Sequence, residues 1–420
     1  MVIESQGQLD KVIELVKTKN FFIQVLCDTI KKHPSDDKIS VIMLYFDEWY
    51  VVPFDHIDCI NLSDAQQEQF LVELVCSNTK KYCVDKKRLL HLVKCANLID
   101  LKMSRYLSDN EVLDDEDFYT NTQQIFHYEW RNLKKINNLL PITKLIEYTT
   151  KIYDSYKSYD NHQECSDVYH NLMLESYQTI ESNGIQTTDG IVYSEYNPFT
   201  STGRPSNRFG GINFAALNKK DGSREQFVSR FGGDGVLVEM DFDAYHLRLI
   251  ADKVGYEFPQ GSVHEHMAQF YGVDYEEAKR LSFQYLYGYI PQEVVELNPY
   301  FGKVSDYIRE LWEEFKSRDF IESDIYNRQI HKKNLTDMNA NKLFNYTIQL
   351  METENNMRVL NRLIPQIKDF SSKLILYSYD SFLLDFNMKD GLDYLMKVKN
   401  ILEQDGKYPV KVSWGLNYHE

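Results

Sequence analysis

Two aspartates stand at the ends of apolar segments that lie far apart in the sequence. Asp241 comes near the end of the predicted strand GVLVEMDF (235–242), and LILYSYDSFLLDF (374–386) predicts two strands joined at Asp380-Ser381. Two-metal phosphoryl transfer needs carboxylates on a rigid sheet that can hold cations about 4 Å apart. Hard oxygen ligands select Mg²⁺, with Mn²⁺ as the alternative. Taken singly, each aspartate is more simply a turn residue, because turns favour Asp.

A predicted helix between the two aspartates carries a cation and two aromatic rings on one face. Lys279, Phe283 and Tyr287 follow one another at four-residue intervals within 273–288, so their side chains share a face. Such a face can take a triphosphate at its cationic end and a base at its aromatic end. The alternative is an amphipathic core helix whose lysine extends into solvent, and the spacing alone favours this alternative.

The C-terminal half of the chain, from residue 189 to the end, resembles the family A DNA polymerases, the bacterial polymerase I group. Several motifs of that family occur in the family's own order, and this order carries the resemblance. The motifs are Thr202-Gly203-Arg204, Asp241 followed by HLRLIA (246–251), Val263-His264, Lys279 with Phe283, Tyr287 and Gly288, Asn345 with Gln349, Tyr379-Asp380-Ser381, and the ending YPVKVSWGLNYHE (408–420).

The resemblance implies a role for each matched residue. Asp241 and Asp380 would hold the metal ions, and Lys279 would complete the catalytic set. The nucleotide-binding residues would be His264, Lys279, Phe283, Tyr287 and His246. The DNA-binding residues would be Arg204, Asn213, Arg248, Asn345 and Gln349.

The sequence departs from the family at several site positions. Tyr275 replaces an arginine that contacts the triphosphate, and His246 replaces a glutamate that packs beneath the sugar. In the hairpin motif, Tyr379 replaces a histidine and Ser381 replaces a glutamate. Asn341 stands where the family has an arginine upstream of the Asn-x3-Gln pair. Both metal-binding aspartates are retained.

The first 110 residues predict a small α/β domain. Apolar runs and capping signals define its elements. The predicted elements are a helix at 9–18, a strand at 21–27, a hairpin of strands 39–46 and 49–54, a helix after the N-cap Ser63 and a helix across 87–93.

This block resembles the proofreading exonuclease domain of the same family, with its active site decayed. Asp28-Thr29-Ile30 stands where the family has Asp-Thr-Glu, and Val84 and Arg88 stand where it has Asn and Asp. Metal-dependent cleavage needs several carboxylates, so the resemblance implies a polymerase without proofreading. An unrelated small α/β domain is the alternative.

The expected fold class is α+β and multi-domain: a right-hand polymerase with palm, fingers and reduced thumb, preceded by a small RNase H-like exonuclease domain. A short thumb grips the duplex weakly, which predicts low processivity unless a partner protein helps.

The acidic stretch 109–118 is the expected linker, and 151–163 is either the thumb tip or a solvated loop. The expected domains are the exonuclease-like domain at 1–110, the helical connector and reduced thumb at 111–188, the palm at 189–260 with 366–420, and the fingers and palm connection at 261–365.

Composition narrows the functional classes. Of the residues, 43% are apolar and 14% are aromatic, which allows a sizeable core and suits base stacking. The net charge of −16 weighs mildly against nucleic-acid binding, so binding would depend on local basic tracks. The candidate tracks are Arg204 with Arg208, Lys219 with Lys220, and Lys332 with Lys333.

The cysteines and the first residues of the chain indicate the cellular compartment in which the protein is expected. The six cysteines form no Cys-x-x-Cys pair, which argues against zinc and favours a reducing compartment. No apolar run reaches membrane-spanning length, and the start lacks a signal-peptide pattern. We expect a cytoplasmic protein without a membrane partner, in the host cytoplasm if the compact, divergent chain is a viral or phage replication enzyme.

These observations predict a template-directed DNA polymerase that adds deoxynucleotides to a primer 3′ end. Its partners would be primer-template DNA and dNTPs, with a processivity factor as a further candidate. One alternative is a polymerase-fold protein that binds DNA or a partner without efficient catalysis, which Tyr275, His246 and Ser381 favour. Another is a polymerase that uses an RNA template or ribonucleotides, which the altered position 246 favours.

Overall fold

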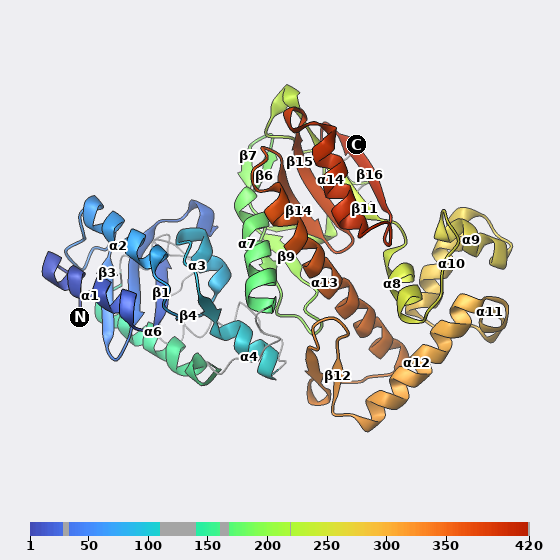
Figure 1. Ribbon diagram of the computed structural model, residues 1–420, viewed down its shortest axis with the longest axis horizontal. Helices are drawn as coiled ribbons and strands as arrows, with labels where there is room; N and C mark the ends of the chain where they lie inside the picture. Colours follow the sequence, from blue (N-terminus) through green and yellow to red (C-terminus); the bar gives the residue numbers. More distant parts are fainter. Residues whose placement is uncertain (28–32, 110–139, 160–167, 219, 419–420) are drawn as a thin grey trace. The chain divides into compact units, whose positions relative to one another are not determined.

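The computed structural model describes residues 1–27, 33–109, 140–159, 168–218 and 220–418 (Figure 1). The chain divides into two compact units, unit 1 (Met1–Ser182) and unit 2 (Asn183–Glu420). Within the described residues, no helix combines the length and the apolar character needed to cross a membrane. Several predicted features fall outside the described residues in whole or in part: Asp28-Thr29-Ile30, the linker after Asp109, residues 160–163 of the expected thumb tip, Lys219 of a basic track, and residues 419–420 of the ending motif.

Unit 1 is built on a five-stranded sheet with the strand order β3-β2-β1-β4-β5. The neighbours β1, β2 and β3 are antiparallel, whereas β1, β4 and β5 run parallel. Strand β1 and the hairpin of β2 and β3 confirm the sequence prediction. The strands are β1 (Phe21–Cys27), β2 (Ile39–Tyr45), β3 (Trp49–Pro53), β4 (Lys81–Cys83) and β5 (Leu98–Asp100).

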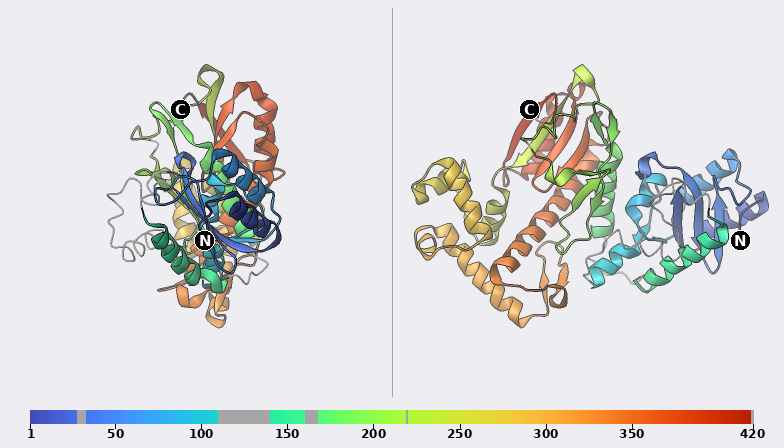
Figure 2. Two further views of the ribbon diagram at one scale, coloured as in Figure 1. Left: turned by 90° about the vertical axis from the view of Figure 1, so that its left-hand side faces the viewer. Right: turned by 180° about the vertical axis from the view of Figure 1, so that it is seen from behind.

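Helices cover both faces of this sheet. In β1, Phe21 and Ile23 pack into a core with α1 and α2, and Phe22 packs into a second core with α6, because successive strand residues point to opposite faces. The left view of Figure 2 shows the strands between α6 and the pair α1 and α2. The helices are α1 (Gln6–Thr18), α2 (Asp64–Cys76), α3 (Lys86–Leu92), α4 (Leu101–Asp109), α6 (Ile142–Tyr156) and α7 (Leu174–Asn183).

Unit 2 contains a four-stranded antiparallel sheet, the central sheet, with the strand order β14-β15-β11-β16. The segment 235–242 confirms the prediction of a buried strand. The turn between β14 and β15 consists of Tyr379 and Asp380, so Ser381 already belongs to the second strand and the predicted junction is wrong by one residue. The strands are β11 (Gly235–Phe242), β14 (Lys373–Ser378), β15 (Ser381–Asn387) and β16 (Val410–Gly415).

The two faces of this sheet differ. Helix α14 covers one face, where Phe386 of β15 stacks on Tyr394 of the helix with ring centroids 5.9 Å apart. Phe382 lies on the same side as Phe386 and pairs with Met240 of β11. Asp241, one residue after Met240, therefore points to the opposite face.

The remaining helices of unit 2 form a second core beside the sheet, centred on α8, α9, α10, α12 and α13. Helix α13 is 28 residues long and contacts α8, α10, α12 and α14, so it joins this helical core to the sheet (Figure 1). The helices are α8 (Tyr245–Lys253), α9 (Val263–Tyr271), α10 (Tyr275–Tyr287), α11 (Gln292–Leu297), α12 (Pro299–Ser317), α13 (Ala340–Ile367) and α14 (Gly391–Glu403). The shorter strands are β6 (Ile185–Thr187), β7 (Gly190–Val192), β8 (Tyr196–Asn197), β9 (Ser206–Phe209), β10 (Ile212–Asn213), β12 (Phe320–Glu322) and β13 (Gln329–His331).

Local capping explains where two predicted helices begin. At the start of α2, the backbone N–H of Ser63 donates to Gln66 Oε1 at 3.0 Å, which is one half of a capping box. At the start of α10, the carboxylate of Asp274 accepts the backbone N–H of Glu277 at 2.9 Å. Because Asp274 is the N-cap, α10 begins at Tyr275, two residues later than predicted.

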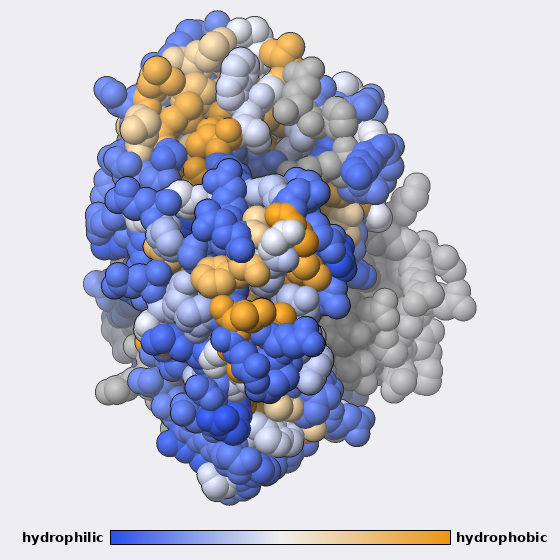
Figure 3. Space-filling view, turned by 90° about the vertical axis from the view of Figure 1, so that its right-hand side faces the viewer, coloured by the Kyte–Doolittle hydropathy of each residue, from blue (hydrophilic) through white to orange (hydrophobic). Residues whose placement is uncertain are grey.

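An exposed apolar area covers α14 and the edge strand β16. Leu392 and Met396 of α14 are 75% and 54% exposed, and Trp414 of β16 is 68% exposed. Figure 3 shows hydrophobic residues gathered in the upper part of that view, where the central sheet and α14 lie. Trp414 pairs with Val238, which lies on the α14 side of the sheet. The apolar area therefore faces away from Asp241.

Candidate active site

Strand register brings Asp241 and Asp380 together at one end of the central sheet. Asp241 of β11 pairs with Ser381 of β15, the residue that follows Asp380. The backbone N–H of Phe242 donates to the carbonyl of Asp380 at 2.9 Å, which holds the turn against the end of β11. Two carboxylates from neighbouring strands thus lie at the same end of the sheet.

The turn that carries Asp380 contains a left-handed residue. Tyr379 has a φ of 61°, which is unfavourable for a bulky side chain. The side-chain amide of Asn356 in α13 donates to the carbonyl of Tyr379 at 2.6 Å and to the hydroxyl of Tyr377 at 2.9 Å. These bonds offset the cost of the strained residue and fix the position of Asp380.

The surroundings of Asp380 disfavour its negative charge. Asp380 is exposed at the rim of the sheet. Neighbouring atoms nevertheless shield its carboxyl group from water, and this desolvation, followed by the charge of Glu352, raises the pKa of the group. A divalent cation would offset both effects. Asp241 and Asp380 supply the hard carboxylate oxygens that Mg²⁺ and Mn²⁺ prefer, so the residues present fit a site for such a cation.

A third aspartate, Asp243, follows Asp241 closely in the sequence and is neutralised by two cations. Asp243 Oδ1 lies 2.6 Å from Lys411 Nζ, and its Oδ2 lies 3.3 Å from Arg248 Nη2. Burial opposes the charge of Asp243, but Lys411 and Arg248 together lower the pKa of its carboxyl group. Lys411 pairs with Asp241 across β16 and β11, so it lies on the Asp241 side of the sheet.

Helix α10 presents the face predicted from its spacing. Lys279 is exposed, and the rings of Phe283 and Tyr287 stack with centroids 6.0 Å apart and planes 5° apart. His264, at the start of α9, lies between Tyr275 and Phe283, with ring centroids 5.7 Å and 5.5 Å away. The cation and the rings of this face therefore adjoin a histidine from the neighbouring helix.

Several charges surround His264. The residue is 2% exposed. Burial lowers the pKa of His264 to about 4, Asp243 opposes the shift, and three nearby cations add to it. These cations are Lys279, Lys411 and Arg248. The arrangement keeps the imidazole neutral, and the exposed Lys279 adds positive charge near it, which suits a polyphosphate.

One face of α13 contributes polar side chains to the same region. The side-chain amide of Asn345 donates to the carbonyl of Tyr287 at 3.1 Å, and the amide oxygen of Gln349 accepts the hydroxyl of Thr202 at 2.9 Å. Residues three or four positions apart share a helix face. The polar residues of this face are Asn345, Gln349, Glu352 and Asn356.

Glu352 is completely buried on this face, with 0% of its surface exposed. Its Oε2 lies 2.8 Å from Arg204 Nε, and its Oε1 lies 3.1 Å from His246 Nε2. The other ring nitrogen of His246, Nδ1, is hydrogen-bonded to the hydroxyl of Tyr287. The guanidinium of Arg204 lies over the ring of Tyr379, 3.7 Å from its centroid.

These contacts gather most of the predicted site residues around one end of the central sheet. Asn213 belongs to a different sheet, the small sheet β10-β9-β8, where it pairs with Arg208. Arg248 is engaged within the unit, because it donates to the carbonyls of Asp243 and Gly261 at 3.0 Å and 3.2 Å. The gathered residues are Asp241, Asp380, Arg204, His246, Arg248, His264, Lys279, Phe283, Tyr287, Asn345 and Gln349.

The sequence analysis missed Glu352 and Lys411. Glu352 stands in the polar run METENNMR (351–358), so the sequence gives no sign that its side chain is buried. Its partner Arg204 is 148 positions away, so no local pattern identifies the pair. Lys411 stands in a short strand at the chain end and shows no pattern of its own.

Within the described part of unit 1, Val84 and Arg88, two of the positions expected to be remnants of an exonuclease site, offer no acid. Val84 is buried in the core. Arg88 lies 3.6 Å from Asp37, measured between Nη2 and Oδ2, and it places a cation where the family resemblance implies an acid. Asp28-Thr29-Ile30 lies outside the described residues.

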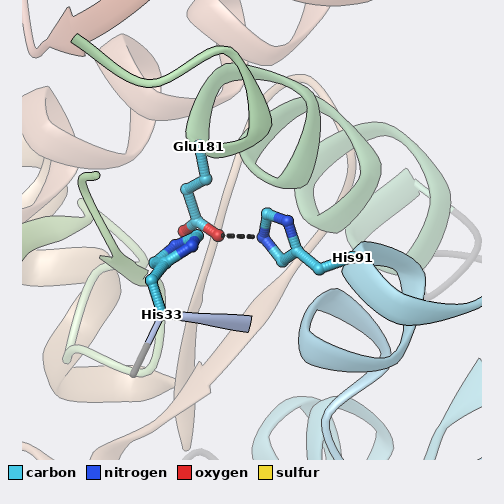
Figure 4. Close-up of side chains that lie close together, drawn as sticks. All are labelled: His33, His91 and Glu181. Carbon is cyan, nitrogen blue, oxygen red and sulfur yellow. Dashed lines mark hydrogen bonds and ion pairs between the residues drawn. The ribbon is translucent and has the colours of Figure 1, made fainter. Parts of the chain in front are cut away.

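One group among the described residues combines side chains of metal-binding type. His33, His91 and Glu181 of unit 1 bring one ligand atom each within 4.8 Å of one another. Figure 4 shows the three side chains converging, with Glu181 joined to His91. Lys87 Nζ also lies 2.7 Å from Glu181 Oε1. Because this ammonium group already neutralises the carboxylate and repels a divalent cation, a buried ion-pair network explains the cluster.

Comparison with known proteins identifies the fold. No protein-family model matches the chain, and no curated protein matches its sequence. A solved structure, the POL domain of Pol1 from M. smegmatis in complex with DNA primer-template and dNTP, is similar to this chain with a TM-score of 0.72 and 14% identity. The match covers 99% of this chain and 98% of that chain. The chain therefore has the mixed α+β fold of a DNA polymerase domain.

Proposed function

We propose that the chain is a template-directed DNA polymerase that adds deoxynucleotides to a primer 3′ end. The observation that carries the proposal is the register that sets Asp241 beside the Asp380 turn, within a fold similar to a polymerase domain. The similar structure contains DNA primer-template and dNTP, which supports the same classes of partner for this chain. Membership of family A, as the motifs predict, belongs to this proposal.

Asp241 and Asp380 are the proposed metal-holding residues. Two magnesium ions bound there would stabilise the attacking and leaving oxygens of an in-line displacement. The bonds of Asn356 to Tyr379 and Tyr377 keep the turn in place, so the carboxylate of Asp380 is oriented before substrate arrives. Such preorganisation reduces the reorganisation needed during reaction.

Lys279 and His264 are the proposed contacts for the triphosphate. Lys279 is exposed on α10, so its ammonium group is accessible to phosphate oxygens. His264 is neutral at physiological pH because burial lowers its pKa to about 4, and a neutral imidazole can donate one hydrogen bond. The stacked rings of Phe283 and Tyr287 offer a flat apolar surface for the base and sugar of the nucleotide.

Arg204, Asn345 and Gln349 are the proposed contacts for the primer-template. Their side chains lie beside the Asp380 turn and the end of α10, where the primer end has to meet the nucleotide. Asn213 and Arg248 are proposed as more distant DNA contacts. Unit 1, with Val84 in place of an asparagine and Arg88 in place of an aspartate, is proposed to lack proofreading.

The proposed domain division follows the sequence boundaries. Residues 189–260 and 366–420 would form the palm, and 261–365 the fingers and palm connection. Residues 1–110 would form the degenerate exonuclease-like domain, and 111–188 a connector with a reduced thumb. With so little chain for the thumb, stable grip on long templates would require a processivity partner.

Primer extension with crossed templates and nucleotides tests this function. DNA and RNA templates are each combined with deoxyribonucleotides and ribonucleotides, in Mg²⁺, in Mn²⁺ and with a chelator. We expect extension on the DNA template with deoxyribonucleotides, and none with the chelator. Absence of extension in every combination would favour a DNA-binding protein without catalysis. Preferred use of RNA or ribonucleotides would reassign the substrate.

A further inference from the structure

The buried carboxylate of Glu352 lies at the junction of three elements of the candidate site. It comes from α13, its partner His246 comes from α8, and its partner Arg204 precedes β9. A carboxylate buried without partners would be strongly unfavourable. Glu352 therefore needs its two partners, and in turn it restrains both of them.

The charge of Glu352 favours a proton on one ring nitrogen of His246. Among the described residues Nε2 makes no hydrogen bond, but it lies 3.1 Å from the carboxylate oxygen, and this negative charge favours a proton on the nearer nitrogen. In the neutral imidazole, Nδ1 is then an acceptor. The hydroxyl of Tyr287, which is hydrogen-bonded to Nδ1, consequently donates its proton to His246.

The charge of Glu352 also reaches the tyrosine itself. Burial, followed by the charge of Glu352, raises the pKa of the Tyr287 hydroxyl, so the group stays protonated and able to donate. Tyr287 remains 40% exposed, with its ring stacked on Phe283. A chain of contacts thus runs from a buried anion, through His246, to an aromatic ring at the surface of the site.

We propose that Glu352 is a positioning residue that sets the sugar selectivity of the nucleotide site by fixing His246 and, through it, Tyr287. This inference rests on the proposed polymerase function. His246 stands where a glutamate is expected beneath the sugar, and Glu352 of α13 supplies a carboxylate to the pair of His246 and Tyr287. The ring of Tyr287, fixed in this way, leaves less room for a 2′-hydroxyl, so deoxyribonucleotides are preferred.

Replacing Glu352 by Gln tests the proposal with little change of shape. The Gln amide can present either an oxygen or an N–H to His246, so the tautomer of the histidine is no longer dictated. We expect the ratio of kcat/KM for deoxyribonucleotides to that for ribonucleotides to fall about tenfold, the effect of about one hydrogen bond. The readout is single-nucleotide extension with each nucleotide class.

Glu354→Gln is the matched control. Glu354 lies on the same helix and is equally buried, at 0% exposure, but it accepts the backbone N–H groups of Ile325 and Tyr326 at 3.3 Å and 3.2 Å. We expect its substitution to leave the selectivity ratio unchanged. If Glu352→Gln does not fold, His246→Gln decides instead, because it keeps the pair of Glu352 and Arg204 while removing the imidazole.

The outcomes separate this proposal from the proposed function. An equal loss for both nucleotide classes in Glu352→Gln would mean that Glu352 only stabilises the fold, and it would overturn the positioning role. A tenfold fall in the ratio, with the control unchanged, would support that role. Absence of extension by the wild-type chain would instead contradict the polymerase function on which the inference rests.

Discussion

Each unit of the molecule contains a completely buried glutamate that is matched with one basic side chain and one histidine. In unit 1, Glu181 lies 2.7 Å from Lys87 and 2.8 Å from His91, measured between the nitrogen and oxygen atoms. The side chains of Lys87 and His91 are themselves only 10% and 1% exposed. Burial, followed by the charge of Lys87, lowers the pKa of His91 to about 3, so the histidine stays neutral.

In unit 2, Glu352 has the same kinds of partner in a different setting. Arg204 and His246 are 28% and 11% exposed, and each extends beyond the carboxylate to an aromatic ring of the candidate site, Tyr379 or Tyr287. The unit 1 trio of Glu181, Lys87 and His91 ends in the core. The unit 2 trio of Glu352, Arg204 and His246 ends at a surface that substrates can reach.

This difference shows that residue types alone do not define a functional site. Both trios contain an acid, a base and a histidine, and in unit 1 Glu181 and His91, together with His33, also bring their ligand atoms within 4.8 Å of one another. What distinguishes the trio in unit 2 is its position beside Asp380 and the exposed edges of its partners. We therefore expect substitutions in unit 1 to change stability and substitutions in unit 2 to change catalysis.

The largest effect on stability is expected for Glu181→Ala. Removing the carboxylate leaves the ammonium group of Lys87 buried without its counter-ion, and breaking a buried pair in this way costs about 3–5 kcal/mol. Chemical denaturation followed by circular dichroism measures the free energy of unfolding. Glu147→Gln is the control, because Glu147 pairs with Lys144 and Lys151 at the surface and should change stability little. Equal stability of the wild type and Glu181→Ala would remove the distinction between the trios.

In unit 2, Lys279→Ala sharpens the comparison by removing a charge without removing structure. Charge-assisted contacts to phosphate are worth about 1.5–3 kcal/mol, so kcat/KM for the nucleotide should fall by roughly 10- to 150-fold. Arg280→Ala controls for loss of a neighbouring cation, since Arg280 pairs with Glu277 at 2.6 Å. Steady-state extension at varied nucleotide concentration gives the values. Similar values for the wild type and Lys279→Ala would argue that α10 does not contact the triphosphate.

A smaller effect is expected for Lys411→Ala. Lys411 adds positive charge near His264, but its side chain is 63% exposed, and exposed charge interactions are worth up to about 1 kcal/mol. The nucleotide KM should rise by about fivefold or less, with kcat nearly unchanged. Lys407→Ala is the control, because Lys407 pairs with Asp252 at 2.7 Å. Equal KM values for the two variants would exclude a phosphate role for Lys411.

Local sequence was sufficient to predict the elements that carry the site. The apolar run at 235–242 indicates β11, and the spacing of Lys279, Phe283 and Tyr287 indicates that these side chains share one face of α10. Both follow from periodicity, which needs no knowledge of distant residues. The turn was misplaced by one residue, because the left-handed Tyr379 depends on bonds from Asn356 in α13.

The contacts that set the charge of the site could not be predicted in this way. Glu352 is joined to Arg204 over 148 positions, and Lys411 meets Asp243 only because β16 pairs with β11. Tertiary packing decides such pairs, and a single sequence carries no periodic signal for them. The matched motifs identified most of the gathered residues, while Asn213 lies in another sheet.

Primer extension by the wild type and by Asp241→Asn and Asp380→Asn tests the central claim most directly. Asparagine preserves the size of each side chain while removing the charge that binds a divalent cation. Circular dichroism and thermal unfolding establish that each variant is folded. We predict steady extension with pyrophosphate release by the wild type in Mg²⁺, and no measurable extension by either folded variant. Substantial extension by Asp241→Asn or Asp380→Asn would contradict the account.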